Sequence, residues 1–275
     1  MNSEFFKIFK AGSVTYFYCS LFFPPEVRDD VFRLYAFVRT ADDFVDCIPP
    51  KKKEFLGFKN EYFKVLSLGK SNNKVIDSMV ELIDRRNFKQ EWVESFLEVM
   101  EQDLNQTKCQ TLDDTIDYMY GSAEVIGLMM AKIMNLPDKA TESAQMLGRA
   151  FQYVNFIRDI AEDNSLGRQY IPVDVVAKYG LESLCIEDAQ ANQDKFTLLI
   201  RDQINLYRQW MLQASKGFEY IPKRFRVPIQ TSAQMYDWTA EQIAENPLVV
   251  FGKKVKPSPT QVVKQIALNW WGEKT

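Results

Sequence analysis

The stretch from Phe151 to Pro172, FQYVNFIRDIAEDNSLGRQYIP, carries the pattern that decides the fold. Neither Pro nor Gly interrupts residues 151–163, so this part is predicted to form one helix. At about 100° per residue, one narrow face of that helix carries Gln152, Asn155, Asp159 and Asp163. Amides and carboxylates fill this face in place of the Lys and Glu mixture of an ordinary solvated surface. The segment therefore predicts a helix with a functional polar face.

A second pair of carboxylates with the same spacing lies upstream, in RLYAFVRTADDFVD. Asp42 and Asp46 are four residues apart, and Tyr35 and Arg39 share their helix face. Like charges at this spacing repel mildly, so two such pairs, each beside an arginine, indicate a shared counter-charge. Mg²⁺ fits, because it takes oxygen ligands and is held by one or two carboxylates together with substrate phosphates. The alternative, two solvated faces with stray Asp residues, is common for one pair and less so for two pairs in apolar surroundings.

The composition narrows the chemistry. The chain of 275 residues has no histidine, which excludes Ser-His-Asp and Cys-His catalysis and His-ligated zinc. Its four cysteines form no CxxC pair, which fits a reducing cytosol better than a disulfide framework. The net charge of −3 gives no electrostatic case for nucleic acid as a partner. Any catalysis must rest on carboxylates, Tyr, Arg, Lys, backbone groups or a metal ion.

No segment predicts a signal peptide or a membrane span. The N-terminal MNSEFFKIFKAG mixes charged residues into its aromatics, and the longest uncharged run, residues 11–25, is shorter than the roughly 20 residues of a typical span. We therefore expect a cytoplasmic protein that touches a membrane at most peripherally.

Helical periodicity runs through almost the whole chain. Helices are predicted at Val27–Cys47, Glu54–Leu68, Lys74–Asp84, Gln90–Gln106, Leu112–Asn135, Asp188–Pro222 and Phe225–Ala244. Strand-like alternation is confined to VVFGKKV, residues 249–255, and there is no internal repeat or domain linker. The prediction is one all-α domain over residues 1–275. Such a domain with two facing Asp pairs suits metal ions that clamp a diphosphate while an aromatic cavity shelters an allylic carbocation.

On these features the chain resembles the squalene/phytoene synthases, which join two prenyl diphosphates head to head. The resemblance covers residues 12–256, and its motifs are SVTYFY (13–18), YAFVRTADDFVD (35–46), YGSAEVIG (120–127), QYVNFIRDIAED (152–163) and GRQYIP (167–172). The last two, in this order and spacing, are the specific ones, because DDxxD also occurs in terpene cyclases and chain-elongating prenyltransferases. The fold that the resemblance implies is a class I isoprenoid synthase-like helical bundle around a central apolar cavity.

The resemblance also implies roles for individual residues. The metal ligands would be Asp42, Asp46, Asp159 and Asp163, binding Mg²⁺ or alternatively Mn²⁺, with Tyr35 and Arg39 as further catalytic residues. Substrate contacts would come from Ser13, Thr15, Arg39, Tyr120, Gln152, Asn155, Arg158, Arg168, Tyr170 and Tyr236. Asp43 and Glu162 point away from their pairs and are expected outside direct metal contact. Small residues at Gly121, Ala123 and Gly127 would line a prenyl channel, although tight helix packing explains them equally well. The tail VVFGKKVKPSP (249–259) resembles the family's basic closing motif only loosely, and its lysines are assigned no role.

The implied reaction condenses two farnesyl or two geranylgeranyl diphosphates through a cyclopropylcarbinyl diphosphate. Its product would be a C30 or C40 hydrocarbon such as squalene, dehydrosqualene or phytoene, and NADPH would be needed only for squalene. The many bulky aromatics favour farnesyl slightly, and candidates for the tunnel floor are Phe22, Phe23, Phe37 and Val38. The alternatives are a prenyl diphosphate phosphatase-like enzyme or a terpene cyclase on the same fold, and, outside enzymes, a lipid-binding helical protein.

Overall fold

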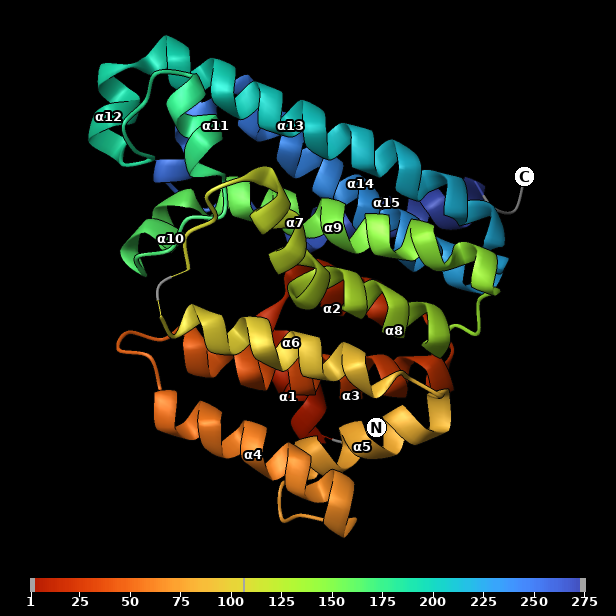
Figure 1. Ribbon diagram of the computed structural model, residues 1–275. Coiled ribbons are helices and arrows are strands. Elements are labelled where there is room, and N and C mark those ends of the chain that lie inside the picture. The colour runs from red at the N-terminus through yellow and green to blue at the C-terminus, as the bar shows by residue number, and fades with distance from the viewer. Residues whose placement is uncertain (1–2, 106, 273–275) are drawn as a thin grey trace.

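The apolar periodicity of the sequence becomes a bundle of α-helices (Figure 1). The computed structural model describes residues 3–105 and 107–272, and within these ranges there is no β-strand, only an isolated bridge between Lys108 and Gln169. The predicted all-α class is confirmed. The single domain over 1–275 stays a prediction, and its ends at residues 1–2 and 273–275 lie outside the described residues, as does the predicted helix end at Gln106.

The helices follow the predicted segments closely. The first half of the chain forms α1 (Ser3–Gly12), α2 (Val14–Ser20), α3 (Pro25–Val45), α4 (Lys52–Leu68), α5 (Lys74–Arg86), α6 (Gln90–Asp103), α7 (Leu112–Met119), the π-helical turn η1 (Tyr120–Glu124), α8 (Val125–Ile133) and the 3₁₀ turn η2 (Asp138–Ala140). The second half forms α9 (Thr141–Arg158), α10 (Ile160–Ser165), α11 (Val173–Lys178), α12 (Ile186–Ala191), α13 (Gln193–Ser215), η3 (Lys216–Tyr220), α14 (Lys223–Glu245), η4 (Pro247–Phe251) and α15 (Pro259–Gly272).

Three predicted elements differ from the structure. The helix predicted over Leu112–Asn135 is divided by the π-helical turn η1, and the one predicted over residues 151–163 is divided at Asp159, whose φ of −101° and ψ of 14° are not helical. The segment VVFGKKV is no strand, because its first residues belong to the 3₁₀ turn η4. π-Helical turns inside α-helices are frequent at functional sites.

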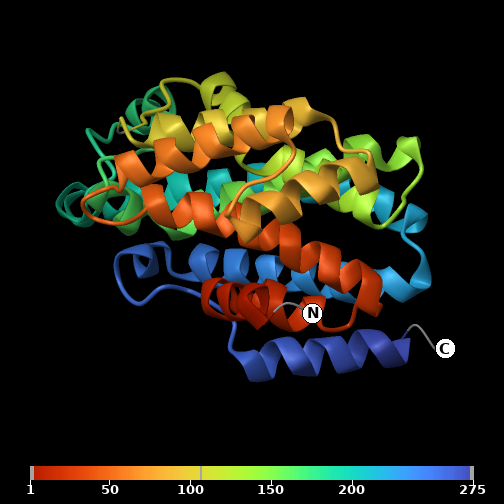
Figure 2. The ribbon, with the colours of Figure 1, turned by 90° about the horizontal axis from the view of Figure 1, so that it is seen from below.

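Helix α9 is the centre of the bundle. It packs against α13 and α14 on one side and against α8 and η1 on the other (Figure 1). Below α8 follow α6 and α3, and then α4 and α5 (Figure 1). Helix α15 lies outside the bundle against α2 and α14, as the view from below shows (Figure 2). Of the helices in the described part of the chain, none is both long and apolar enough to cross a membrane.

Small residues bring α8 and α9 into close contact. A Cβ atom added to Gly127 would lie 2.2 Å from the backbone oxygen of Ala144, and one added to Gly148 would lie 2.4 Å from that of Ala123. Backbone atoms cannot yield as a flexible side chain can, so this approach requires glycine on both helices. The packing interpretation therefore holds at Gly127, and Ala123 and Gly127 also line the cavity described below, whereas Gly121 packs against Val99 and does not line it.

We predict that Gly127→Ala lowers the free energy of unfolding by about 1–3 kcal/mol, because the new methyl group forces the two backbones apart. Urea denaturation followed by circular dichroism measures the change. Gly57→Ala is the matched control, because nothing lies within 4 Å of a Cβ at this position in α4. Removing glycine from an open helix position should raise stability by roughly 0.5–1 kcal/mol. Equal effects of the two substitutions would contradict the packing argument.

Candidate active site

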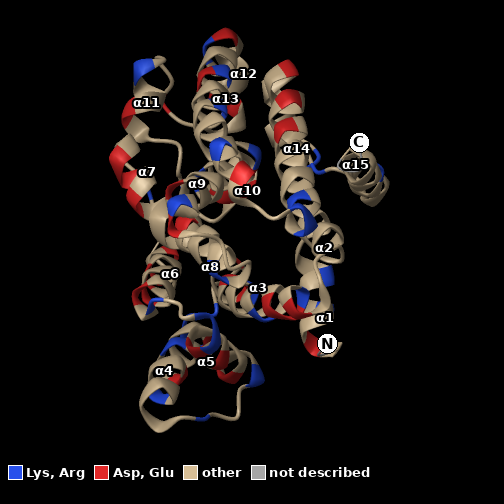
Figure 3. Cartoon of the chain, turned by 90° about the vertical axis from the view of Figure 1, so that its right-hand side faces the viewer, with Lys and Arg blue, Asp and Glu red and all other residues tan. Residues whose placement is uncertain are grey.

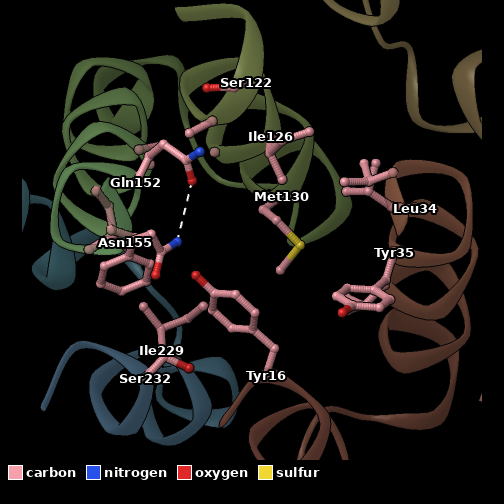
Figure 4. A pocket seen from close by; sticks show the side chains of 18 of the residues that line it. Tyr16, Leu34, Tyr35, Ser122, Ile126, Met130, Gln152, Asn155, Ile229 and Ser232 are labelled. Carbon is pink, nitrogen blue, oxygen red and sulfur yellow. Dashed lines mark hydrogen bonds between the residues drawn. The ribbon is translucent and has the colours of Figure 1, made fainter. Parts of the chain in front are cut away.

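A cavity of about 440 Å³ runs through the bundle between α3, α8, α9 and α14 (Figure 4). This volume lies within the usual range of ligand pockets. Most of its lining is aliphatic or aromatic, with Leu34 and Tyr35 on one wall and Ile126 and Met130 on another (Figure 4). The cavity is therefore apolar in its main part, with few places for polar contact.

The side chains of α9 that face the cavity change in polarity along the helix. Ala144 and Gly148 line its deep end, Gln152 and Asn155 its middle, and Asp159 its mouth. The three- and four-residue steps between them keep all five on one helix face. The predicted polar stripe is thus the wall of a cavity that has its charged end at one side only.

Both predicted carboxylate pairs lie at this mouth. Asp42 and Asp46 come from the last turns of α3, and Asp159 and Asp163 from the junction of α9 and α10; all four line the cavity. The charge of Asp46 acts on Asp163, so the two pairs face each other across the opening. The non-helical residue Asp159 turns the chain here, while the backbone N–H of Asp163 still donates to Asp159 O at 2.8 Å.

Two arginines neutralise the first pair. Arg39 contacts Asp42 Oδ2 at 3.0 Å and Asp43 Oδ1 at 2.5 Å. Arg168, only 4% exposed, contacts Asp46 Oδ1 at 2.6 Å and donates to the backbone oxygen of Val45 at 2.7 Å. Arg168 thereby ties the GRQYIP segment to the C-terminal end of α3, although Asp46 and Arg168 are 122 positions apart in the sequence.

Two cations also hold Asp159. Arg158 donates from Nε to Asp159 Oδ1 at 2.8 Å and from a terminal nitrogen to Oδ2 at 2.6 Å, while Lys254 Nζ lies 3.0 Å from Oδ1. Lys254 also pairs with Glu162. Burial opposes the charged form, but these two cations outweigh it and hold the pKa of Asp159 below its usual value. The tail lysine that the sequence left without a role thus reaches the second carboxylate pair.

At Asp42 and Asp163, by contrast, the nearby arginines do not outweigh burial and the neighbouring carboxylates. Burial, together with the charge of Asp46, raises the pKa of Asp42 to about 8. Burial and the charge of Asp159 raise the pKa of Asp163 well above its usual value. A cation bound at the mouth would stabilise the charged forms of these two carboxyl groups and so lower their pKa values.

One group of site residues was not predicted. Asp103 lines the cavity at the end of α6 and accepts hydrogen bonds from Tyr118 at 2.5 Å and from Tyr170 at 2.8 Å. Arg168 lies 3.9 Å from Asp103 Oδ2. Burial raises the pKa of Asp103, although Arg168 and the two hydroxyls oppose the rise. The sequence feature that could have indicated its burial is that Asp103 lies on the same helix face as the buried residues Phe96 and Met100.

Aromatic side chains surround the mouth. Tyr236 stacks on Phe151 with 4.2 Å between ring centroids, and Tyr16 lies 5.7 Å from Tyr236. Burial raises the pKa of Tyr16 well above its usual value, and the neighbouring Tyr236 adds to the rise. Tyr35 stacks on Phe9 at 3.8 Å. These phenols are neutral at physiological pH and serve as hydrogen-bond donors.

Two polar atoms in the middle of the cavity have no hydrogen-bond partner among the described residues. They are Asn155 Oδ1 and Ser122 Oγ, both buried. Asn155 donates from its amide nitrogen to Gln152 Oε1 at 3.3 Å, which leaves its oxygen free to accept (Figure 4). Buried polar atoms without partners are rare and favour a bound ligand or water at this point.

The structure brings most predicted site residues together. The cavity is lined by Tyr35, Asp42, Asp46, Gln152, Asn155, Arg158, Asp159, Asp163, Arg168 and Tyr170. Arg39 and Tyr236 lie directly behind this lining, against Asp42 and Phe151. Among the predicted tunnel-floor residues, Phe23 and Val38 line the cavity, whereas Phe37 is in the core and Phe22 on the surface.

Three predicted residues lie elsewhere. Ser13 caps α2, accepting from the backbone N–H of Tyr16 at 3.2 Å, and neither Ser13 nor Thr15 is part of the lining that the structure describes. Tyr120 borders a separate pocket with Trp92 and Lys132. The π-helical turn that begins at Tyr120 adds a residue and so rotates the helix after it by about 100° relative to the helix before it; Ser122, Ala123 and Gly127 line the cavity, and Tyr120 does not.

The donor set fits a hard cation in part. Mg²⁺ prefers oxygen ligands, and the mouth offers carboxyl oxygens from two walls. Binding of the cation would favour the charged forms of Asp42 and Asp163, whose pKa values burial raises. Within the residues that the structure describes, however, no three His, Cys, Asp or Glu side chains converge closely enough to hold a metal by themselves. The residues fit an ion that completes its coordination with phosphate oxygens and water, as Mg²⁺ commonly does.

Known proteins resemble the chain over almost its whole length. The family model described as squalene/phytoene synthase matches residues 9–261. A 15-cis-phytoene synthase of Enterobacter agglomerans is 32% identical over 249 residues, which cover 82% of this chain and 80% of that protein. A 15-cis-phytoene synthase of a Paracoccus species is 24% identical over 272 residues, 94% of this chain and 88% of that protein.

Solved structures agree on the fold. A dehydrosqualene synthase in complex with a ligand has a TM-score of 0.85 at 21% identity, over 99% of this chain and 96% of that one. The squalene synthase HpnC of Alicyclobacillus acidocaldarius has a TM-score of 0.76 at 21% identity, over 87% and 91%. The helical bundle is therefore of the isoprenoid synthase type, as predicted. The chain belongs to the squalene/phytoene synthase family, which confirms the resemblance seen in the motifs.

We predict that the metal-free protein loses stability as the pH rises from about 4 to about 8. The Asp42 side chain is 31% exposed within the cavity, but its pKa is raised from 3.8 to about 8. In this interval the unfolded chain releases a proton that the folded chain retains, so increasing pH favours unfolding. Asp163, with its raised pKa, acts in the same direction.

Thermal denaturation in a chelating buffer measures this effect. Asp42→Asn should flatten the pH dependence and raise the melting temperature at pH 8. Asp117→Asn, at an exposed position of α7 that does not line the cavity, is the control and should leave the slope as in the unchanged protein. A stability that rises through this interval in the unchanged protein would show that Asp42 is ionised in the folded state.

Proposed function

We propose that this protein condenses two prenyl diphosphates head to head, and that its substrate is geranylgeranyl diphosphate and its product the C40 hydrocarbon phytoene. The observation that carries the proposal is the pair of facing carboxylate pairs at the mouth of one deep apolar cavity. The relatives named phytoene synthase support the C40 product over the slight lean to farnesyl that the aromatic content suggested.

The mouth is suited to hold diphosphates. Arg158 and Lys254 on one wall and Arg39 and Arg168 on the other can turn from carboxylates to phosphate oxygens. Asp42, Asp46, Asp159 and Asp163 would hold Mg²⁺, or Mn²⁺ in its place. The ions would supply Lewis-acid stabilisation of the departing diphosphate. These residues would hold the charge of the departing diphosphate at the mouth, and the rest of the cavity carries little charge.

The cavity beyond the mouth shelters the carbocation. Aromatic faces such as those of Phe151 and Tyr16 attract a cation without forming a bond to it, and the apolar lining excludes water. The first condensation would give the cyclopropylcarbinyl diphosphate, and ionisation and rearrangement would follow. Because burial raises the pKa of Tyr16 and Tyr170, these phenols stay protonated, and a diphosphate oxygen is the better acceptor for the final proton.

The deep end of the cavity has room for a long chain. Lining residues of α9 extend from Ser143 to Asp159, a helix length of about 24 Å at 1.5 Å per residue. Ala140, Ala144 and Gly217 are the small residues at this end. An extended C20 prenyl chain can occupy such a length without folding back on itself.

Other products and other reactions on the same fold are distinguished by the experiment described next. NADPH would be required only if the product were squalene. A phosphatase-like enzyme would release prenyl alcohol, and a cyclase would form a ring from one substrate. A cytoplasmic location and peripheral membrane contact also stay predictions.

We expect the purified protein to convert geranylgeranyl diphosphate with Mg²⁺ into a C40 hydrocarbon, without NADPH. Mass analysis of a hexane extract measures the product. Asp42→Asn and Asp159→Asn should each lower kcat/KM by about 100-fold or more, because charge at the leaving group is lost. Asp117→Asn, exposed on α7, is the control and should retain full activity.

The products separate the alternatives. A C30 hydrocarbon from farnesyl diphosphate would replace the C40 assignment, and dependence on NADPH would identify it as squalene. Geranylgeraniol alone would indicate the phosphatase-like enzyme. A folded protein without turnover on either substrate would contradict the catalytic proposal and favour a lipid-binding protein.

We predict that Ala144→Phe shifts the preference from geranylgeranyl toward farnesyl diphosphate by about tenfold or more, because the phenyl ring shortens the deep end of the cavity. Competition between the two substrates, read as the C40 to C30 product ratio, measures the shift.

Glu142→Phe is the control, because the same ring on the exposed face of α9 should leave the ratio unchanged. An equal product ratio in both variants would show that this end of the cavity does not select chain length.

A further inference from the structure

Helix α15 presents an apolar face to the outside of the molecule. Its packed side carries Val262 and Ile266, both buried, and Asn269, which donates to Thr231 Oγ1 at 2.8 Å and to Gln234 Oε1 at 2.7 Å. At about 100° per residue the opposite side carries Val263, Ala267, Leu268, Trp270 and Trp271, with Lys264 as its one charged residue. In Figure 3 the helix is tan along almost its whole length. An outer helix of a globular protein normally has polar residues on this side.

These residues form a continuous surface with the end of α2. We define the aromatic surface as Phe22, Val263, Leu268, Trp270 and Trp271, whose side chains are between 39% and 66% exposed. The rings of Phe22 and Trp270 lie 6.4 Å apart, which joins the two helices. Contiguous exposed apolar residues of this kind mark an interaction site.

Basic residues border the aromatic surface. Phe23, next to Phe22, packs on Phe225 with 6.2 Å between ring centroids, and the Arg224 guanidinium lies 4.6 Å from the Phe225 ring. Arg28 donates to the backbone oxygen of Leu21 at 3.4 Å. The first turn of α14, where Lys223 and Arg224 are exposed, has no acidic residue. We define the basic rim as Arg28, Lys223 and Arg224.

We propose that the aromatic surface and the basic rim dock this protein on the anionic face of a phospholipid bilayer. Trp side chains favour the boundary between lipid headgroups and acyl chains, because the indole is apolar with one polar N–H. Lys and Arg at the same level attract anionic lipid phosphates. The net charge of the chain is −3, so a rim of this sign is not a general property of its surface.

Charge distinguishes the bilayer from a second copy of this chain. A two-fold interface through the aromatic surface would bring each residue of the rim close to the rim of the partner. Lys264 lies within the aromatic surface itself, between Trp271 and Leu268 on the helix face, and would meet a like charge there. An anionic bilayer removes this repulsion and also accommodates the aromatic rings.

The docked surface covers the cavity wall. Cys19 of α2 lines the cavity and also packs against Val262 and Ile266 of α15, so a single layer of helices, α2 with α14, separates the docking helix from the cavity. Under the proposed function, on which this part of the inference rests, an apolar product would then be released beside the bilayer. The docking itself depends only on the surface residues.

Vesicle flotation tests the proposal with the full chain. We expect the protein to float with phosphatidylcholine vesicles that contain phosphatidylglycerol, less with phosphatidylcholine alone, and less as salt screens the rim. The double substitution Trp270→Ala with Trp271→Ala should lower vesicle partitioning by about tenfold or more. Lys223→Gln with Arg224→Gln should remove most of the dependence on phosphatidylglycerol.

Two matched variants test whether the loss of any exposed apolar pair, or of any exposed basic pair, is enough to weaken vesicle binding. Leu198→Ala with Leu212→Ala changes two residues of α13 that are 56% and 68% exposed, and should leave flotation unchanged. Lys52→Gln with Lys53→Gln, in the first turn of α4, removes two exposed charges far from the rim and should also leave it unchanged.

Three results would overturn the proposal. The unchanged protein fails to float with either vesicle, the control pairs lose binding as strongly as the tryptophan pair, or size-exclusion chromatography shows a dimer that the tryptophan pair abolishes. Turnover measured in detergent tests the proposed function separately from the docking proposal. Trp270 and Trp271 do not line the described cavity, so the variant that lacks both should keep full activity in detergent. Flotation without turnover would contradict the proposed function but still support the docking surface.

Discussion

The repulsion among four carboxylates at one opening is the constraint on which the rest of the site depends. Two pairs of Asp residues face each other at a partly buried opening, and the arginines and the lysine beside them compensate their charges unequally. Asp159 is held in its charged form by Arg158 and Lys254, whereas Asp42 and Asp163 keep raised pKa values. A bound cation would therefore be stabilised by the carboxylates of the opening, and a bound anion by its arginines and lysine. A metal diphosphate brings both at once.

The same constraint accounts for the irregular points of the helices. Asp159 leaves helical geometry where the chain must aim two carboxylates and an arginine at one opening, and the π-helical turn at Tyr120–Glu124 lies where α8 meets α9 and α6. Departures from regular helical geometry cost free energy, and they persist only where the packing around them stabilises the irregular conformation. The close backbone contact at Gly127 supplies such packing.

Periodicity and residue chemistry predicted the helical class, most helix bounds and the two Asp pairs. They could not predict the register of the helix that contains Tyr120, because the π-helical turn depends on tertiary packing and not on local preference. Asp103 was missed because a carboxylate at a helix end usually marks solvent, and its burial depends on Tyr118 and Tyr170 from distant segments. Lys254 was missed because its partner Asp159 lies far away in sequence.

The C-terminal segment links the two ends of the site. Lys254 attaches it to Asp159 at the charged mouth, Val255 and Pro257 are buried beyond this point, and α15 then packs on α2, whose Cys19 lines the apolar wall. One stretch of about twenty residues thus touches both the charge that starts the proposed reaction and the wall next to the apolar space. Because α15 joins the fold through a small cluster separate from the main core, its position depends on contacts at Val262, Ile266 and Asn269. Its inner face packs on α2, behind the cavity wall, while its outward aromatic face is exposed and can meet a second, apolar environment.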